Sequence, residues 1–489
     1  MVGNKVKRSV YMSTPIIDYL KRFHYRKPVS FHVPGHKNGA CYPEGLIEFK
    51  SVLSFDVTEL DGLDDLHDPT GIILESQQLL ADYYKAKKSY YLVNGSTVGN
   101  LAMIYASFQK GDYVFVQRNC HKSVLNGLSL REAIPVFLEP CYDEQTGQAI
   151  GLEPNIVKEA YQKYPHAKGI LITYPNYYGV SLPVKEVIAE AKRCNLKVLV
   201  DEAHGVHFQV GEPFPPPALS LGADIVVQSA HKMLPALTMS AYLHISESIN
   251  DDEVEVLEQA LAMLQSSSPS YLLLASLEGA RDFMENINEE VLQSIVHSVE
   301  QFKLELQLIP QIEVVEYDDT LLQIDPLKVT IKTRTALSGY ELQRIFSKFD
   351  LETELADEFH VLFVCGFVQM PEKVSRQLQL IRDYLHTYTI QERVVPRVNK
   401  QQENISVLTI HQVSRFTQIE RSRAEAVGEI AAEAVIPYPP GVPLVYPGER
   451  IRAEVINQIE RLSQAGARFQ GYQAKKGKIL TIDVEEDQC

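Results

Sequence analysis

The chain has 489 residues, of which 45% are hydrophobic and 22% are charged. This composition is typical of globular proteins, and the length exceeds that of one ordinary domain, so we expect two or three domains with a large buried core. The net charge of −16 argues against a protein that binds nucleic acid or anionic membranes, because both need clustered positive charge.

The N-terminal segment has no apolar run of signal-peptide length, and no later run is long enough to span a membrane. We therefore expect a cytoplasmic protein. Thiols stay reduced in that compartment, and the cysteines lack the spacing of metal ligands, so we expect neither disulfides nor a metal site. The six cysteines are Cys41, Cys120, Cys141, Cys194, Cys365 and Cys489.

Seven apolar, β-rich runs alternate with helix-sized segments between residues 89 and 245. Strands that are apolar throughout and separated by helices are typical of a parallel sheet covered on both faces. The sequence therefore predicts a large α/β domain with a mainly parallel sheet. The runs span residues 89–93, 113–117, 134–140, 168–173, 197–201, 224–229 and 240–245.

Helical patterns follow at 253–287, with a Ser-rich break at 266–270, and at 289–307. Two apolar runs then alternate with two helical patterns, which indicates a smaller α+β unit; these elements span 327–333, 338–349, 360–367 and 372–388. The polar stretch 395–406 is a candidate boundary. We predict three parts: an N-terminal arm with the large domain at 1–310, the small α+β domain at 311–395 and a C-terminal segment at 396–489.

Polar residues follow several predicted strands, at the edge where parallel sheets bind ligands. "NGSTVGN" at 94–100 follows the first strand and opens a helix, whose N-H groups can bind phosphate. Small residues are also common in turns without a ligand, and the motif matches neither GxGxxG nor GxxxxGK[ST], which argues against the usual nucleotide folds. Asp201 follows the fifth strand, where a carboxylate is either paired or a cap or loop residue. Lys232, in "SAHK", follows the sixth.

These residues fit pyridoxal 5'-phosphate better than any other cofactor. The cofactor needs a lysine for covalent attachment, an acidic partner for its pyridine nitrogen and a phosphate-binding turn. Lys232, Asp201 and the turn at 95–97 supply these groups. The dipeptide His-Lys also ends at Lys37 and Lys122, but only Lys232 follows a buried strand and accompanies the other two features.

The sequence resembles the bacterial Orn/Lys/Arg decarboxylases, which are pyridoxal-phosphate-dependent enzymes of aspartate aminotransferase fold (fold type I). It is similar to the shorter Gram-positive-type members that lack the N-terminal wing domain, because "PGHK" begins at residue 34. The resemblance rests on the order and spacing of motifs over most of the chain. The motifs are "FHVPGHKNG", "ELDGLDDLHDPTGII", "NGSTVGN", "RNCHKS", "YPNYYGV", "DEAHGVHF", "SAHKMLPALTMSAYLH", "SSSPSY", "TELADE" and "IPYPPGVPLVYPGE".

The resemblance implies a role for each candidate residue. Lys232 forms the Schiff base, Asp201 keeps the ring nitrogen protonated, and His121 stacks on the ring. His204 lies near the ring and is catalytic together with Lys232 and Asp201, while Ala203 packs under the ring. The remaining cofactor contacts are expected from Gly95, Ser96, Thr97, Ser229 and His231, with Ser267 contributed by a second subunit. A homodimer or tetramer with the active site at the subunit interface is therefore expected.

The implied reaction is decarboxylation of a basic amino acid to CO2 and an amine of polyamine biosynthesis. The substrate's distal cation needs acidic groups in the site, although most members of the two available clusters are expected to be solvated loop charges. The candidates are Asp61, Asp64, Asp65, Asp68, Glu354, Asp357 and Glu358. The sequence does not distinguish arginine, lysine and ornithine, and arginine is favoured by the resemblance alone.

Two alternative functions stay open. One is another fold type I reaction such as transamination, because this fold hosts many chemistries. The other is a non-catalytic protein that has kept the cofactor site. Retention of Lys232, Asp201, His121 and the phosphate-binding turn together argues against the second alternative, since a scaffold needs none of them.

Overall fold

Seven strands form the central sheet in the order β1-β10-β9-β8-β6-β2-β3. The neighbouring strands from β9 to β3 pair in parallel, and β10 is antiparallel to both of its neighbours. All seven predicted runs are strands of this sheet, so the expected mainly parallel sheet is confirmed. The strands are β1 (Lys88–Leu92), β2 (Tyr113–Gln117), β3 (Ile134–Leu138), β6 (Gly169–Thr173), β8 (Lys197–Asp201), β9 (Ile225–Gln228) and β10 (Ala241–Ile245).

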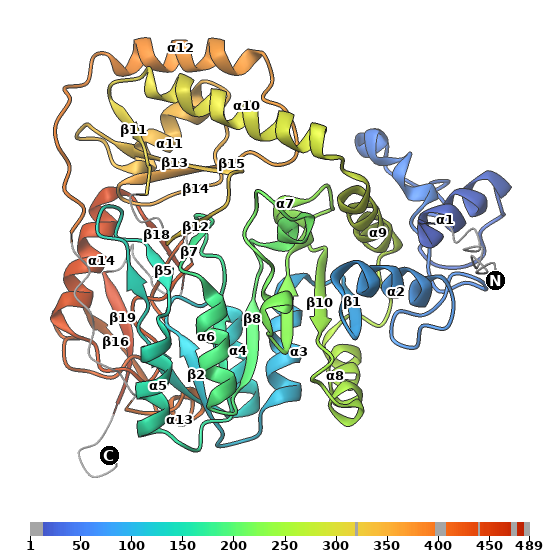
Figure 1. The fold of residues 1–489 in the computed structure, drawn as a ribbon, viewed down its shortest axis with the longest axis horizontal. Helices are drawn as coiled ribbons and strands as arrows, with labels where there is room; N and C mark the ends of the chain where they lie inside the picture. The colour runs from blue at the N-terminus through green and yellow to red at the C-terminus, as the bar shows by residue number, and fades with distance from the viewer. Residues whose placement is uncertain (1–12, 318–320, 397–406, 439–440, 471–476, 484–489) are drawn as a thin grey trace, which may run out of the picture.

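The structure is a computed structural model that describes residues 13–317, 321–396, 407–438, 441–470 and 477–483. Figure 1 shows the central sheet in the middle of the molecule, with the small sheet above it and the C-terminal segment at its left side. Part of the polar boundary at 395–406 and two residues of the "IPYPPGVPLVYPGE" motif lie outside the described residues, as does Cys489.

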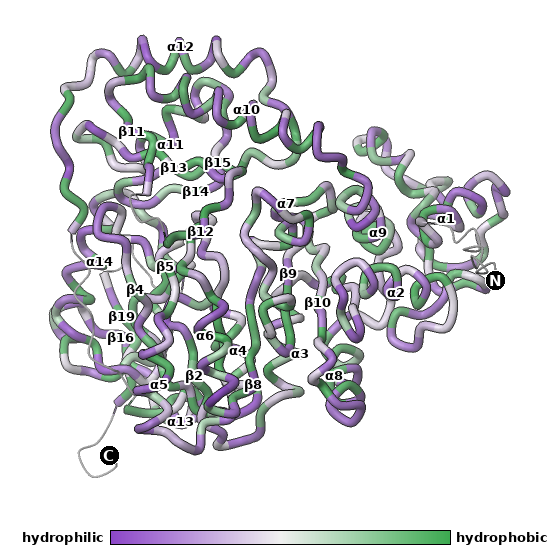
Figure 2. Tube along the Cα trace, viewed as in Figure 1, coloured by the Kyte–Doolittle hydropathy of each residue, from purple (hydrophilic) through white to green (hydrophobic). Residues whose placement is uncertain are grey.

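Helices cover both faces of the central sheet, which explains why its strands are apolar throughout. In β8, Val198 and Val200 belong to one buried core, whereas Leu199 belongs to the core on the opposite face. One face carries α3 (Gly95–Ser107), α4 (Lys122–Arg131) and α8 (Asp251–Leu264); the other carries α2 (Ile72–Tyr84), α5 (Pro154–Lys163), α6 (Val184–Arg193) and α9 (Tyr271–Asn286). In Figure 2 the central strands have mostly the hydrophobic colour, whereas α12 at the upper edge alternates between the two colours.

A second sheet is antiparallel and has the order β11-β13-β15-β14. Its elements are β11 (Ile312–Val314), β13 (Lys328–Thr333), β14 (Leu355–Ala356) and β15 (His360–Val364), with α10 (Glu289–Gln307), α11 (Gly339–Lys348) and α12 (Lys373–Leu385) beside them. The predicted helix and strand alternation of this α+β unit is confirmed. The short strand β12 (Gln323–Ile324) pairs with β7 (Val180–Ser181) and thereby joins this part of the chain to the large domain.

The C-terminal segment packs against the large domain rather than against the small sheet alone. The side chain of Arg118 forms two hydrogen bonds, of 2.7 and 2.9 Å, with the carboxylate of Glu449, and the Tyr446 hydroxyl donates to the Arg118 carbonyl. The segment contains α13 (Ile410–Val413), β16 (Gln418–Ser422), β17 (Ile436–Tyr438), α14 (Ala453–Ala465), β18 (Arg468–Gln470) and β19 (Lys478–Ile482).

The remaining elements are short or belong to the N-terminal arm. They are α1 (Pro15–Arg26), α7 (Ala230–Met233), β4 (Cys141–Tyr142), β5 (Ala149–Gly151) and the 3-10 turns Glu44–Phe49, Val52–Ser54, Val206–Val210 and Ala218–Leu221. No described helix is long and apolar enough to cross a bilayer. No disulfide joins any two cysteines in the part of the chain that the structure describes. The predicted division into 1–310, 311–395 and 396–489 stays a prediction.

Candidate functional site

A cavity of about 260 Å³ opens at the carboxyl ends of β1, β2, β6, β8 and β9. This is the edge of the sheet at which parallel strands present ligand-binding loops. Ten of the eleven residues predicted from the sequence border it: Gly95, Ser96, Thr97, His121, Asp201, Ala203, His204, Ser229, His231 and Lys232. We call it the lysine cavity. The roles assigned to these residues stay predictions.

The N-terminus of α3 forms one side of the lysine cavity. Gly95 begins this helix with a φ of +76°, a left-handed conformation that a side chain disfavours. The preceding Asn94 does not cap the helix, because its side-chain oxygen accepts from the N-H of Ser266 at 3.2 Å. The Ser229 hydroxyl donates to the Ser96 hydroxyl at 2.7 Å. An uncapped helix N-terminus beside two hydroxyls suits a phosphate group.

Lys232 reaches the cavity from α7, the single helical turn that follows β9. Its Nζ lies 3.0 Å from His204 Nε2. Burial lowers the pKa of Lys232, whereas the charges of Asp201 and Glu354 raise it. The lysines of the other two His-Lys pairs do not line this cavity: Lys37 donates to the His32 carbonyl, and Lys122 donates to Gln470 Oε1.

Asp201, the last residue of β8, is buried and is held by hydrogen bonds. Its Oδ2 accepts from Asn100 Nδ2 at 2.7 Å, and its Oδ1 accepts from the N-H of Ala203 at 3.2 Å. The same Asn100 nitrogen donates to Ser123 Oγ at 2.9 Å, and that hydroxyl lies 2.7 Å from Nδ1 of His121. The network therefore fixes the carboxylate and the imidazole relative to each other.

His121 also caps α4. Its Nδ1 accepts from the N-H of Ser123 at 3.2 Å, which leaves Nε2 as the nitrogen that carries the proton of the neutral ring. Burial lowers the pKa of His121, although the charge of Asp201 opposes this effect. The ring is therefore held neutral at the cavity wall, which is compatible with the stacking role predicted for it.

Sequence reasoning missed three residues that shape this site. Asn100 lies one turn along α3 from Ser96, so its helical spacing could have revealed it. Tyr177 borders the cavity from the loop after β6, where "YPNYYGV" was the available signal. Lys328 contacts Nδ1 of His204 at 3.0 Å, but it belongs to the small sheet, and no local pattern connects that strand to the lysine cavity.

The predicted acidic candidates fall into separate places. Asp64 accepts from the backbone N-H groups of Thr70, Gly71 and Ile73 at 2.8 to 3.0 Å, so it organises the start of α2. Burial acts to raise its pKa, but these hydrogen bonds leave the pKa below its ordinary value. None of Asp61, Asp64, Asp65 and Asp68 lines the lysine cavity.

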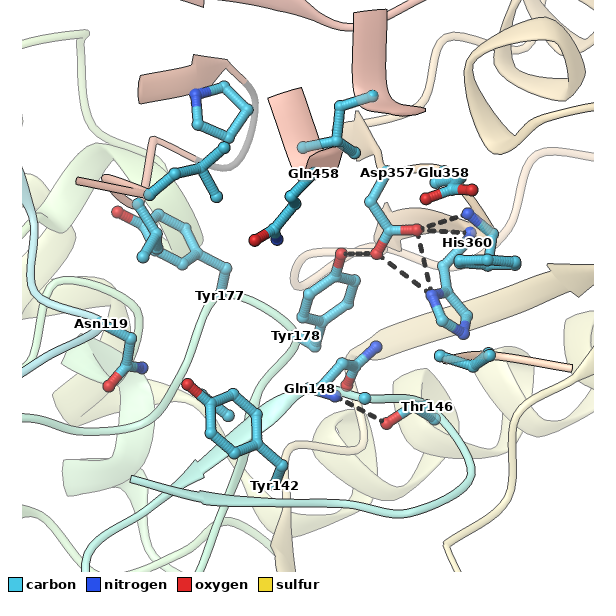
Figure 3. A pocket seen from close by; sticks show the side chains of 18 of the residues that line it. Asn119, Tyr142, Thr146, Gln148, Tyr177, Tyr178, Asp357, Glu358, His360 and Gln458 are labelled. Carbon is cyan, nitrogen blue, oxygen red and sulfur yellow. Dashed lines mark hydrogen bonds and ion pairs between the residues drawn. The ribbon is translucent and has the colours of Figure 1, made fainter. Parts of the chain in front are cut away.

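The other acidic cluster lies nearer. Asp357 and Glu358 border a second cavity, of about 290 Å³, which shares Tyr177 with the lysine cavity. Figure 3 shows the hydrogen bonds that the Asp357 carboxylate forms there with Tyr178 and His360. Glu354 lines neither cavity, but its charge raises the pKa of Lys232 and of Lys328, so it is the acidic candidate that acts on both lysines.

Two further expectations concern groups outside one chain. Ser267 is exposed and does not line the lysine cavity of its own chain; its predicted contribution to a second subunit's site stays a prediction. Among the described residues, no group of three His, Cys, Asp or Glu side chains is arranged to hold a metal ion.

Two family models match the chain: "Orn/Lys/Arg decarboxylase, major domain" over residues 14–317 and "Orn/Lys/Arg decarboxylase, C-terminal domain" over residues 411–479. The uncharacterized protein YaaO of Bacillus subtilis is 42% identical, over 97% of this chain and 100% of its own length. An arginine decarboxylase of the same organism is 32% identical, over 97% of this chain and 98% of its own length.

The fold is similar to that of the constitutive lysine decarboxylase of Escherichia coli. The TM-score is 0.78 at 18% identity, over 96% of this chain and 82% of that chain. The predicted fold class, a fold type I large domain with a mainly parallel sheet and a smaller α+β domain, is confirmed. The family models, the named relatives and the shared fold agree, so the chain belongs to the Orn/Lys/Arg decarboxylase family and is an amino-acid decarboxylase.

Proposed function

We propose that this chain decarboxylates a basic amino acid with pyridoxal 5'-phosphate held in the lysine cavity. The observation that carries the proposal is the gathering of ten predicted cofactor contacts around one cavity, with Lys232 among them. The cavity offers an amine, a buried carboxylate and an uncapped helix N-terminus, and the cofactor needs each of these groups.

Each residue has a defined task in this proposal. Bound pyridoxal phosphate supplies an electron sink for the electron pair left on Cα when CO2 departs. Lys232 attaches the cofactor, and Asp201 holds a proton at the ring nitrogen while Asn100 fixes the orientation of its carboxylate. His121 packs against the ring. The phosphate is bound by the N-terminus of α3 together with Ser96, Thr97, Ser229 and His231.

We propose arginine as the substrate, and its product as a precursor in polyamine biosynthesis. The support is the name of the Bacillus subtilis relative that is 32% identical over nearly the full length of both chains. Glu354 is the proposed partner of the distal cation, because its charge already acts on the amine of Lys232. A carboxylate binds a guanidinium through paired, charge-assisted hydrogen bonds.

We also propose that two chains form a dimer, or two dimers a tetramer, with the active site at the interface. The N-terminal arm exposes apolar side chains that a partner would cover, with exposed fractions of 77% for Tyr25, 81% for Val29 and 93% for Phe31. Ser267 is exposed and does not line the lysine cavity of its own chain, which suits its predicted role in the active site of a second subunit.

The test is to incubate the purified protein and pyridoxal phosphate separately with arginine, lysine and ornithine, and to measure CO2 and amine. We expect equimolar CO2 and amine, with the highest turnover for arginine. Release of a 2-oxo acid without CO2 would show transamination instead. No turnover of any substrate, despite bound cofactor, would favour the non-catalytic alternative. A Glu354→Gln variant should raise KM more than it lowers kcat, whereas the exposed Glu247→Gln should change neither.

A further inference from the structure

His204 lies between two lysine side chains that come from different sheets. Its Nε2 is 3.0 Å from Nζ of Lys232, and its Nδ1 is 3.0 Å from Nζ of Lys328. Lys232 follows β9 of the central sheet, whereas Lys328 begins β13 of the small sheet. His204 is 7% exposed and Lys328 is 5% exposed, so these contacts are largely shielded from solvent.

These two contacts restrict the protonation states of His204, Lys232 and Lys328. Burial, reinforced by the two lysines, lowers the pKa of His204 well below its ordinary value, so the ring is neutral. A neutral imidazole has one N-H donor and one acceptor nitrogen, whereas an ammonium group can only donate. The lysine that faces the imidazole N-H must therefore be a neutral amine, and the other lysine must be the donor.

The surroundings of Lys328 identify it as the protonated donor. Its Nζ also donates to the carbonyl of Tyr177 at 3.1 Å, and the charge of the fully buried Asp325 favours its ammonium form. Burial lowers the pKa of Lys328 to about 8, so the ammonium form still predominates at neutral pH. Asp325 Oδ1 accepts from the N-H of Leu327 at 3.0 Å, which holds the carboxylate in place, and its Oδ2 lies 3.0 Å from His207 Nε2.

Lys232 has fewer groups to accept its protons. Its contact with His204 is the one hydrogen bond that the structure gives to its Nζ within the described ranges. The charge of Asp201 favours the ammonium form of Lys232, but the two Asp201 oxygens accept from Asn100 and from the N-H of Ala203 rather than from Lys232. Glu354 acts on both lysines and so does not distinguish them.

We propose that Lys328 is a positioning residue that donates to His204 Nδ1, so that the Nε2-H of His204 donates to Lys232 and holds its Nζ as a neutral amine. This inference deepens the proposed function, because it concerns the lysine to which the cofactor attaches. A neutral amine joins an aldehyde directly: its nitrogen bonds to the aldehyde carbon, and its two hydrogens leave with the aldehyde oxygen as water. An ammonium must first lose a proton.

The arrangement also makes the small sheet part of the active site. Lys328 is the first residue of β13, and Asp325 directly follows β12, which pairs with β7 of the large domain. The packing of the small sheet on the large domain therefore brings Lys328 to His204, where it determines which ring nitrogen carries the proton.

The first experiment reads the tautomer of His204 by 15N NMR of histidine-labelled, cofactor-free protein, with a His204→Gln variant to assign the signals. We expect the Nε2-H tautomer in the wild type, a change in its signals in Lys328→Met, and retention in Lys328→Arg, which keeps a charged donor. Lys332→Met, on the same strand, is the matched control and should leave the signals unchanged. An Nδ1-H or charged ring in the wild type would overturn the inference even if Lys328→Met does not fold, and so would unchanged signals in a folded Lys328→Met.

The second experiment follows the rate at which added pyridoxal phosphate gives its visible absorbance band, as a function of pH. Loss of the Lys328 donor lets Lys232 keep its proton to higher pH, and each pKa unit corresponds to a tenfold lower amine fraction below the pKa. We expect Lys328→Met to be roughly tenfold slower at neutral pH and to reach the wild-type rate in alkaline solution. Equal rates at neutral pH contradict the inference. Absence of a band in the wild type contradicts the proposed function, and the NMR result then decides the inference by itself.

Discussion

Glu202 is a buried carboxyl next to the proposed ring-nitrogen partner, and it should make stability fall as pH rises. It is 0% exposed and accepts hydrogen bonds from Gln228 Nε2 at 2.5 Å and from the N-H of Ala218 at 2.8 Å. Burial raises its pKa from 4.5 to about 8, although both hydrogen bonds oppose the shift. The folded state therefore keeps the proton between these pH values, whereas the unfolded state releases it.

The expected magnitude follows from this difference in proton binding. While Glu202 is ionised only in the unfolded state, the free energy of unfolding falls by about 1.4 kcal/mol for each pH unit, so the loss of stability reaches roughly 5 kcal/mol by pH 8. Glu202→Gln removes the ionisation and should be stabilised relative to the wild type by an amount that increases with pH at this slope. In this variant an amide N-H can replace the carboxylate oxygen that accepts from Gln228. Two donors then face each other, which destabilises the folded state by ~1 kcal/mol at every pH.

The assay is urea unfolding of both proteins at several pH values between about 5 and 8, where the difference in unfolding free energy is compared. The difference should rise steadily toward alkaline pH. Glu247→Gln, a substitution of an exposed carboxyl, is the matched control and should give a flat difference. A flat difference for Glu202→Gln as well would refute the reasoning, because it would mean that Glu202 is ionised in the folded protein.

Three further substitutions test other contacts. Asn100→Leu removes the donor to the Asp201 carboxylate, and kcat/KM for decarboxylation should fall roughly 10- to 100-fold; an unchanged kcat/KM would show that the bond is dispensable. Gly99→Ala places a Cβ within 2.7 Å of side chains of the central sheet and should cost ~1 to 3 kcal/mol, measured by thermal unfolding. Arg118→Met leaves Glu449 buried without its partner and should cost about 3 to 5 kcal/mol, and adding Glu449→Leu should restore much of this stability.

The sequence predicted the central sheet well because its strands are buried on both faces. A strand such as β8 has apolar residues facing two cores, so its hydrophobicity is visible without any knowledge of its neighbours. The carboxyl ends of such strands meet at one edge, so the sequence alone predicts that Asp201 and Lys232 lie at the same edge, and both line the lysine cavity. The pattern also predicted the roles of Lys232, Asp201 and the turn at 95–97, whereas the roles of the other candidate residues came from the family resemblance.

Contacts between distant segments were not predictable in the same way. Lys328 lies 124 positions from His204 in the chain, and the strand that carries it reads as part of another unit. The acidic clusters show that a suitable residue type can have a purely local role. Asp64 has the carboxylate that a cation site needs, but it accepts hydrogen bonds from backbone N-H groups of its own loop. Local composition identifies such groups, but only the packing of the domains decides what each one contacts.

The most direct test of the proposed function is to find the lysine that bonds to the cofactor. The protein is loaded with pyridoxal phosphate, reduced with borohydride to make the bond permanent, digested, and mapped by mass spectrometry. We predict that Lys232 carries the modification, and that Lys232→Ala loses both the modification and the visible absorbance band. Modification of Lys37, Lys122 or Lys328 instead, or an unchanged band in Lys232→Ala, would contradict it.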